Sequence, residues 1–146
     1  METPIRYKLL TPGAVPPVKM SPGASGWDLH YTGPDVRLWA GSIVRAPTGL
    51  AFDIPRGWEG QIRARSSMAE RGVFVPNSPG TIDSDYRGEV CILLMMLMNM
   101  GEPYLIKGGQ RIAQLVFARV ETGVLCCTTE LSVSNRGAGG FGSTGL

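Results

Sequence analysis

Short apolar runs follow one another along the whole chain, separated by glycine, proline and polar turn residues. Runs of this length bounded by turn-forming residues are typical of β-strands. The pattern predicts strands over residues 5–10, 27–31, 42–46, 49–54, 60–65, 73–75, 89–98, 104–106, 111–120 and 124–128. Many short strands joined by turns indicate an all-β barrel or sandwich.

One short helix is expected beside this β pattern. The segment Ser67-Met68-Ala69-Glu70 has the S-x-x-E form of a capping box, in which the serine and glutamate side chains bind free amides at a helix start. Gly72 follows as a natural stop.

The apolar run over residues 90–98 does not alternate with polar residues. A strand with one face in water should alternate, so this strand should be covered on both faces. A second subunit can supply the second cover, and we favour this interpretation over a central strand in a monomeric sandwich. The run is far shorter than the roughly 20 residues that a membrane-spanning helix needs.

Composition limits the class of protein. The chain has 146 residues, 43% of them hydrophobic and 18% charged, which indicates one folded domain and argues against disorder. We expect a β domain over residues 1–131 and a flexible tail over residues 132–146. A net charge of +2 does not by itself imply a nucleic-acid partner. A compact anionic substrate would need only a local cluster of arginines.

Cysteine usage and the N-terminus predict an intracellular protein. Cys91, Cys126 and Cys127 are odd in number and two are adjacent, so a disulfide framework is not expected and a reducing compartment is. The N-terminus lacks a basic region followed by an apolar one, so no signal peptide is predicted. No membrane partner is expected.

Several kinds of catalytic site are disfavoured by the residue types present. The only histidine, His30, is expected to be a partly exposed bystander rather than part of a Ser-His-Asp triad. Zinc sites use clustered cysteines and histidines, which this chain lacks. Oxygen ligands remain, and these suit Mg²⁺ held with water and phosphate.

The segment over residues 80–89 predicts a tight turn that presents carboxylates and one phenol to a pocket. If the segment is extended, Asp83 and Asp85 lie on the same side. One carboxylate could orient a water as a general base. Asp28, which follows Gly26, is a further candidate and suits metal-bound waters. Turn capping is the alternative role for each aspartate taken singly.

Three further segments carry groups that bind phosphate. Arg65-Ser66-Ser67 offers a guanidinium and two hydroxyls, and Gly109-Gln110-Arg111-Ile112-Ala113-Gln114 offers an arginine and amides. The tail begins at Arg136 and ends in a glycine-rich stretch, whose backbone can wrap a phosphate closely. Phe141 stands alone among glycines, so we expect the tail to order over a bound ligand.

Five segments in this order resemble the five motifs of the trimeric dUTP pyrophosphatases (dUTPases). They are Ala24-Ser25-Gly26-Trp27-Asp28-Leu29, Arg65-Ser66-Ser67-Met68-Ala69, Asn77-Ser78-Pro79-Gly80-Thr81-Ile82-Asp83-Ser84-Asp85-Tyr86-Arg87-Gly88, Gly109-Gln110-Arg111-Ile112-Ala113-Gln114 and Arg136-Gly137-Ala138-Gly139-Gly140-Phe141-Gly142-Ser143-Thr144-Gly145. The resemblance implies a distorted jelly roll or β-clip with one short helix, a homotrimer with shared active sites, and Mg²⁺-dependent hydrolysis of dUTP to dUMP and pyrophosphate. Such an enzyme keeps uracil out of DNA and supplies dUMP for dTMP synthesis.

The resemblance also implies a role for each motif residue. Asp83 would activate the water that attacks the α-phosphorus, and Tyr86 would pack on the deoxyribose. The uracil edge would be read by Asn77, Gly80, Thr81 and Ile82. Asp28 would hold Mg²⁺ through water, and the phosphates would be held by Arg65, Ser66, Ser67 and Gln114. The tail would contribute Arg136, Gly142, Ser143 and Thr144 to the γ-phosphate, with Phe141 stacked over uracil as a lid.

Two rival functions are weighed on the same residues. The Arg-Ser-Ser start of the predicted helix is also similar to the dCTP deaminases, which share the fold but use a glutamate in place of the Asp-x-Asp-Tyr-Arg-Gly turn. Asp83 and Tyr86 are kept here, which favours the dUTPases. A regulatory or interaction protein with weak catalysis is the second rival, and no residue of this chain favours it.

Overall fold

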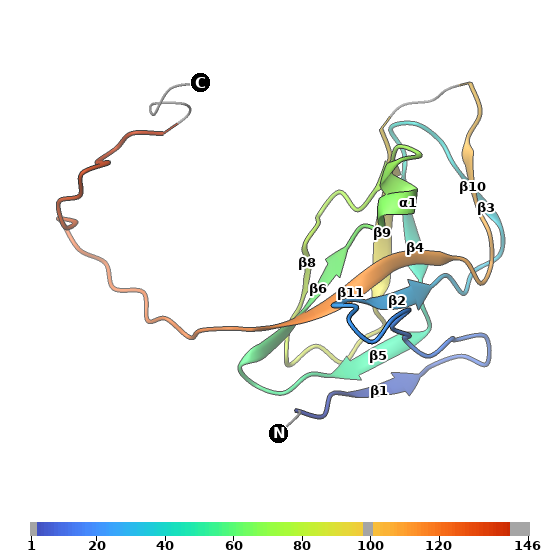
Figure 1. Cartoon of the computed structure of the whole chain (residues 1–146), viewed down its shortest axis with the longest axis horizontal. Coiled ribbons are helices and arrows are strands. Elements are labelled where there is room, and N and C mark those ends of the chain that lie inside the picture. Colours follow the sequence, from blue (N-terminus) through green and yellow to red (C-terminus); the bar gives the residue numbers. More distant parts are fainter. Residues whose placement is uncertain (1–2, 98–100, 141–146) are drawn as a thin grey trace.

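Short antiparallel strands make up nearly all the regular structure of the chain. The computed structural model describes residues 3–97 and 101–140 (Figure 1). Its elements are β1 (Arg6–Leu9), β2 (Trp27–His30), β3 (Val36–Leu38), β4 (Ile43–Pro47), β5 (Leu50–Asp53), β6 (Trp58–Arg63), α1 (Ser66–Ala69), β7 (Val73–Phe74), β8 (Gly80–Ile82), β9 (Cys91–Met96), β10 (Tyr104–Ile106) and β11 (Arg111–Arg119). The predicted all-β architecture with one short helix is confirmed.

The strands form four small sheets. The largest has the order β2-β11-β6-β8, and a second has the order β4-β9-β7. The pairs β1-β5 and β10-β3 complete the body. Every pairing is antiparallel, and the long strand β11 pairs with both β2 and β6. Strands that are neighbours in a sheet are therefore often far apart in sequence.

The core lies between the sheets, and strands such as β9 turn alternate side chains inward. In β9, Ile92, Leu94 and Met96 are buried, whereas Cys91, Leu93 and Met95 are half-buried. The composition of this run does not alternate, but its burial does. The face of β9 that carries Ile92, Leu94 and Met96 packs against the core of this chain. The opposite face is also apolar but only half-buried, so a second subunit could cover it.

Most predicted strands are confirmed, with three differences. Strands β3 and β8 form where no strand was expected, because β10 and β6 respectively offer them a hydrogen-bonding edge. The strand predicted over residues 124–128 is wrong for this chain, since that segment has no pairing partner and is exposed. A β-favouring sequence cannot form a strand without an edge to pair with.

The capping box predicted at Ser67 is also wrong. The N-cap of helix α1 is Arg65, two residues before Ser67, and no side chain caps the helix. The predicted stop is confirmed, because the backbone N–H of Gly72 binds the Ala69 carbonyl at 2.9 Å and Gly72 has a φ of 73°. No helix in the described ranges is long and apolar enough to cross a membrane.

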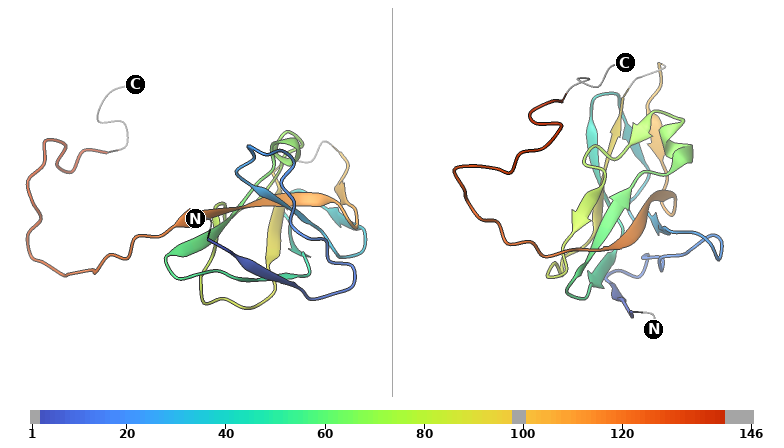
Figure 2. Two further views of the ribbon diagram at one scale, coloured as in Figure 1. Left: turned by 60° about the horizontal axis from the view of Figure 1, so that its bottom comes forward. Right: turned by 60° about the vertical axis from the view of Figure 1, so that its left-hand side comes forward.

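After β11 the chain leaves the body. Val120 still binds the Gly57 carbonyl, at 2.9 Å, but residues 121–138 are all exposed. Both views in Figure 2 show this segment running outside the sheets. Four of its apolar residues are nearly fully exposed: Val124, Leu125, Leu131 and Val133.

The end of the segment over residues 80–89 is tied to the start of β5. The buried Thr48 hydroxyl donates to the Val90 carbonyl at 2.6 Å. The N–H of Gly49 donates to Oε1 of Glu89 at 2.8 Å, and Val90 binds the Leu50 carbonyl at 2.8 Å. These bonds hold the segment against the core.

We expect Thr48→Val to lower the free energy of unfolding by about 1–3 kcal/mol, because the isosteric valine leaves the buried Val90 carbonyl without its donor. Urea unfolding followed by tryptophan fluorescence measures this. Thr48→Ser is the matched control, since it keeps the hydroxyl. Equal stability of the valine variant and the wild type would contradict the role assigned to this bond.

Candidate active site

The segment after β8 folds into a tight turn. The backbone N–H of Tyr86 donates to the Asp83 carbonyl at 3.1 Å, and the carboxylates of Asp83 and Asp85 are both exposed. The chain is therefore not extended here. The argument that alternation along a strand places the Asp83 and Asp85 carboxylates on the same side does not apply. The predicted tight turn is present.

One arginine braces this turn. Nη1 of Arg87 donates to the carbonyls of Ser84, at 2.7 Å, and Tyr86, at 3.0 Å. Its Nη2 lies 2.6 Å from Oδ1 of Asp53 at the end of β5. An exposed ion pair contributes at most about 1 kcal/mol, so the main effect is on the geometry of the turn. Sequence reasoning missed this contact because Asp53 lies outside the motifs.

The phenol of Tyr86 stands over the turn. Its hydroxyl donates to the Glu89 carbonyl at 3.0 Å, and the side chain remains 44% exposed. A Cβ on Gly88 would overlap the phenol ring, so only glycine permits this ring position. The exposed ring face is free to contact a ligand.

A cavity of about 300 Å³ opens beside the turn. It brings together six predicted site residues: Asn77, Gly80, Thr81, Ile82, Asp83 and Tyr86. Its remaining lining was not predicted and comes mainly from β4, β6 and β9: Arg45, Ile62, Glu89, Val90, Cys91 and Leu93. The cavity combines an apolar floor with polar groups and one carboxylate, as small-molecule sites commonly do.

A second cluster forms around Asp28, far from this cavity. Oδ2 of Asp28 accepts a hydrogen bond from Nη1 of Arg111 at 3.0 Å, and Oδ1 lies 3.4 Å from Nε of Arg65. Nη1 of Arg65 in turn donates to the Arg111 carbonyl at 3.0 Å. The three residues thus form a closed ring of contacts between β2, β11 and the start of α1.

Burial makes this ring costly to break. Asp28 is only 9% exposed, and a buried carboxylate is tolerated when cations and hydrogen bonds compensate it. Loss of either arginine would leave part of that charge unpaired. Arg111 lies within a segment predicted to bind phosphate, but its pairing with Asp28 was not predicted.

His30 lies beside the ring, at the register position opposite Arg111. Its Nδ1 is buried and has no hydrogen-bond partner among the described residues. Burial lowers the pKa of the imidazole from its usual 6.5, and the positive charges of Arg111 and Arg65 lower it further, against an opposing effect of Asp28. The predicted partial exposure is confirmed, but the charged neighbours were not anticipated.

Gln114 is held next to the start of α1. Its Nε2 donates to the Ala64 carbonyl at 2.9 Å, and a Cβ on Gly26 would overlap its side chain. Ser66 and Ser67 are exposed on α1. The predicted phosphate-binding residues of the second and fourth motifs therefore lie close to one another.

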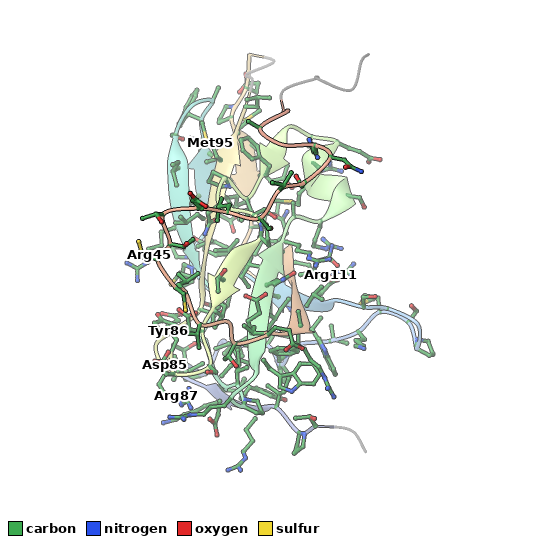
Figure 3. The ribbon with its side chains drawn as sticks, turned by 90° about the vertical axis from the view of Figure 1, so that its left-hand side faces the viewer. Arg45, Asp85, Tyr86, Arg87, Met95 and Arg111 are labelled. Atoms are coloured by element: carbon green, nitrogen blue, oxygen red, sulfur yellow. The ribbon has the colours of Figure 1, made fainter. Side chains whose placement is uncertain are left out.

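The two groups of residues are not together in one chain. In the sheet β2-β11-β6-β8, Asp28 is on one edge strand and Asp83 follows the other. Three strand spacings place these edges roughly 14 Å apart. Figure 3 shows Tyr86 and Arg45 on one side of the ribbon and Arg111 on the other. The cavity beside the turn is not lined by Asp28, Arg65 or Gln114.

Arg136, the predicted tail residue that the structure describes, is not brought to either group. Arg136 is exposed, and its Nε donates to the Gly139 carbonyl at 2.9 Å within the tail itself. The predicted residues Phe141, Gly142, Ser143 and Thr144 lie outside the described residues.

The residues present fit Mg²⁺ only if most of its ligands are waters and substrate phosphates. No group of three or more His, Cys, Asp or Glu side chains in the described part of the chain could hold a metal ion. Both oxygens of Asp28 already face arginines. Mg²⁺ commonly keeps several waters and takes other ligands from substrate phosphates, and this arrangement is compatible with the residues present.

Comparison with known proteins identifies consistent relatives. The model of the dUTPase family matches residues 14–145. The deoxyuridine 5'-triphosphate nucleotidohydrolase of Zymomonas mobilis subsp. mobilis is 47% identical over 150 residues and is covered completely, as is this chain. The enzyme of the same name from Anaeromyxobacter sp. is 52% identical over 125 residues, covering 84% of this chain and 82% of that protein.

The fold is shared with a solved structure. The dUTPase of Staphylococcus bacteriophage 80alpha with dUPNHPP superposes with a TM-score of 0.84 at 26% identity, covering 99% of this chain and 100% of that one. The β fold expected from the motifs is thereby confirmed.

The single histidine allows a direct test of the charged ring. We expect the His30 imidazole to titrate below pH 6.5 in an NMR pH series, and Arg111→Gln to raise the midpoint by removing a nearby cation. In the wild type the pKa of His30 is lower in the folded chain than in the unfolded chain, so the unfolded chain binds the proton more tightly. The free energy of unfolding should therefore fall as the pH drops below 6.5. His30→Gln should remove this part of the pH dependence.

Arg37→Gln, on β3, is the matched charge control and should leave the midpoint unchanged. A wild-type midpoint at or above 6.5 would contradict the arrangement of charges described for this ring.

Proposed function

The chain belongs to the dUTPase family, and we propose that it hydrolyses dUTP to dUMP and pyrophosphate by attack of a water, activated by Asp83, on the α-phosphorus. The observation that carries the proposal is the cavity of about 300 Å³ that joins Asp83 and Tyr86 to Asn77 and the backbone of β8. It offers a carboxylate, a sugar-sized aromatic face and base-reading groups around one space.

Asp83 acts as the general base. Its carboxylate accepts a proton as the water oxygen forms a bond to the α-phosphorus, and the bond from that phosphorus to the α,β-bridging oxygen breaks. Pyrophosphate leaves with the bonding electrons. The brace by Arg87 holds the turn that carries this carboxylate.

The cavity beside the turn selects the nucleoside. Tyr86 packs on the deoxyribose and leaves no room for a 2′-hydroxyl, and Gly88 is required for its ring position. Asn77 and the backbone of Gly80, Thr81 and Ile82 bind the uracil edge, which rejects cytosine because its amino group mispairs.

The ring around Asp28 serves the phosphates. Arg65, oriented by Asp28 and Arg111, stabilises the charge that develops on the phosphates, together with Ser66, Ser67 and Gln114. Mg²⁺, when bound, would supply positive charge beside the phosphates. Asp28 would hold one of its coordinated waters through lone pairs that remain beside its arginine contacts.

A homotrimer completes the site. The carboxylate turn and the Asp28 ring lie at opposite edges of one sheet, so a neighbouring copy must bring the complementary half. The open face of β9, with Cys91, Leu93 and Met95, is the apolar surface available for that contact. Burial of apolar surface of this kind drives subunit association.

The tail over residues 132–146 closes the shared site. The described part of the tail lies outside the body, so it can reach a site on another copy (Figure 2). Arg136 binds the γ-phosphate with Gly142, Ser143 and Thr144, and Phe141 stacks over the uracil. Closure excludes bulk water during the reaction.

Pyrophosphate release from dUTP, dCTP, dTTP and UTP tests the activity, each with Mg²⁺ and with a chelator. We expect fast release from dUTP alone and its loss on chelation. No release from any of the four by folded protein would support the rival binding or regulatory role instead.

Asp83→Asn tests the base. The amide cannot accept the proton of the attacking water, so we expect kcat to fall at least 100-fold, while dUTP still binds. Single-turnover kinetics and calorimetric titration with a non-hydrolysable dUTP analogue measure the two effects. Asp85→Asn is the control, because it makes the same change two residues away. Near wild-type turnover of the Asp83 variant would eliminate Asp83 as the base.

A further inference from the structure

A basic cleft lies on the side of α1 that faces β10. None of the residues proposed to bind the uracil or the deoxyribose lines it. Its volume is about 230 Å³, and its lining includes Arg65, Arg71 and Arg111 together with the hydroxyl of Ser67. A neighbouring cavity shares Arg71, Tyr104 and Gln110 with it and adds Lys107. Four cationic side chains thus border one continuous depression.

The positive charge at the outer end of this cleft is uncompensated. The ion pairs among the described residues involve Arg65, Arg87 and Arg111, and neither Arg71 nor Lys107 takes part in one. Asp35, the carboxylate of the adjoining loop, binds the N–H of Gly108 at 2.9 Å instead. Uncompensated cations around a concave surface attract anions.

The floor of the cleft is held in place. Nε2 of Gln110 lies 2.7 Å from the Tyr104 hydroxyl, to which it donates, and the hydroxyl lies 3.3 Å from the buried Met68 sulfur. Oε1 of Gln110 accepts the N–H of Lys107 at 3.0 Å. The loop carrying Lys107 is thereby tied to the helix, so little ordering is needed when an anion binds.

We propose that this cleft is an anion subsite for the pyrophosphate product, which adjoins the triphosphate site and extends beyond it to Arg71 and Lys107. The inference rests on the proposed function, because pyrophosphate is the product that it supplies. Arg65 and Ser67 belong both to the proposed triphosphate site and to the lining of the cleft, so the leaving anion keeps a cationic partner as it moves from one to the other. Arg71 and Lys107 receive it at the solvent end.

Arg71 and Lys107 are suitable for mutation because they are exposed and make no side-chain hydrogen bond among the described residues. The test compares wild type with Arg71→Gln, Lys107→Gln and the double variant. Arg56→Gln, an exposed cation in the turn between β5 and β6, is the matched control for net charge. Arg71→Lys keeps the charge and should restore most of the affinity.

Calorimetric titration with sodium pyrophosphate should show binding weakened about tenfold by each Gln substitution at the cleft, as expected when one charge-assisted contact is lost. The inhibition constant for pyrophosphate should rise by the same factor. The KM for dUTP, the initial rate without added product and the affinity for dUMP should be unchanged.

Two outcomes would overturn the subsite. One is pyrophosphate binding that is equal in the wild type and the double variant. The other is a KM for dUTP that rises in step with the inhibition constant, which would make Arg71 and Lys107 part of the triphosphate site. Failure of the proposed function gives a different result. In that case the protein would release no pyrophosphate from dUTP, but it would still bind added pyrophosphate in a way that depends on Arg71.

Discussion

The buried carboxylate of Asp28 is the constraint around which the proposed phosphate-binding half of the protein is arranged. It is 9% exposed and lies between Arg65 and Arg111, two cations that would otherwise repel each other. The Arg111 carbonyl closes the ring by accepting from Arg65. Because a buried charge needs full compensation, these three residues fix β2, β11 and the start of α1 relative to one another.

In the proposed site, the ring lets the phosphate-binding residues act without a preformed metal cage. Arg65 is held on one edge by Asp28, and its other donors remain available to an anion. Two sets of residues draw on the same arginine: the hydroxyls and amides near Ser66 and Gln114, and the basic cleft near Arg71. In the proposed subsite, a fixed cation shared between adjacent anion positions would favour stepwise movement of a phosphate along the surface.

The proposed nucleoside-binding half depends on a different kind of constraint. The turn after β8 is held by backbone contacts and by the exposed guanidinium of Arg87, and its far end is tied through Thr48 to the core. Arg45 completes the cavity from β4, and Cys91 and Leu93 complete it from β9. The face of β9 that carries Cys91 and Leu93 is apolar and only half-buried. Cys91 and Leu93 thus belong both to the cavity beside the turn and to the half-buried face of β9. In the proposed trimer, this shared surface couples nucleotide binding to subunit association.

The sequence by itself determined the all-β class, most strands, the family and the cavity residues near Asp83, because these follow from residue types at short spacing. It could not determine that Asp28 pairs with Arg111, which lies 83 positions away, or that the strand predicted over residues 124–128 would have no partner. Those outcomes depend on which strands meet and which edges remain free. Tertiary packing also decided that the carboxylate turn and the Asp28 ring lie at opposite edges of one sheet, because β11 and β6 pair between them.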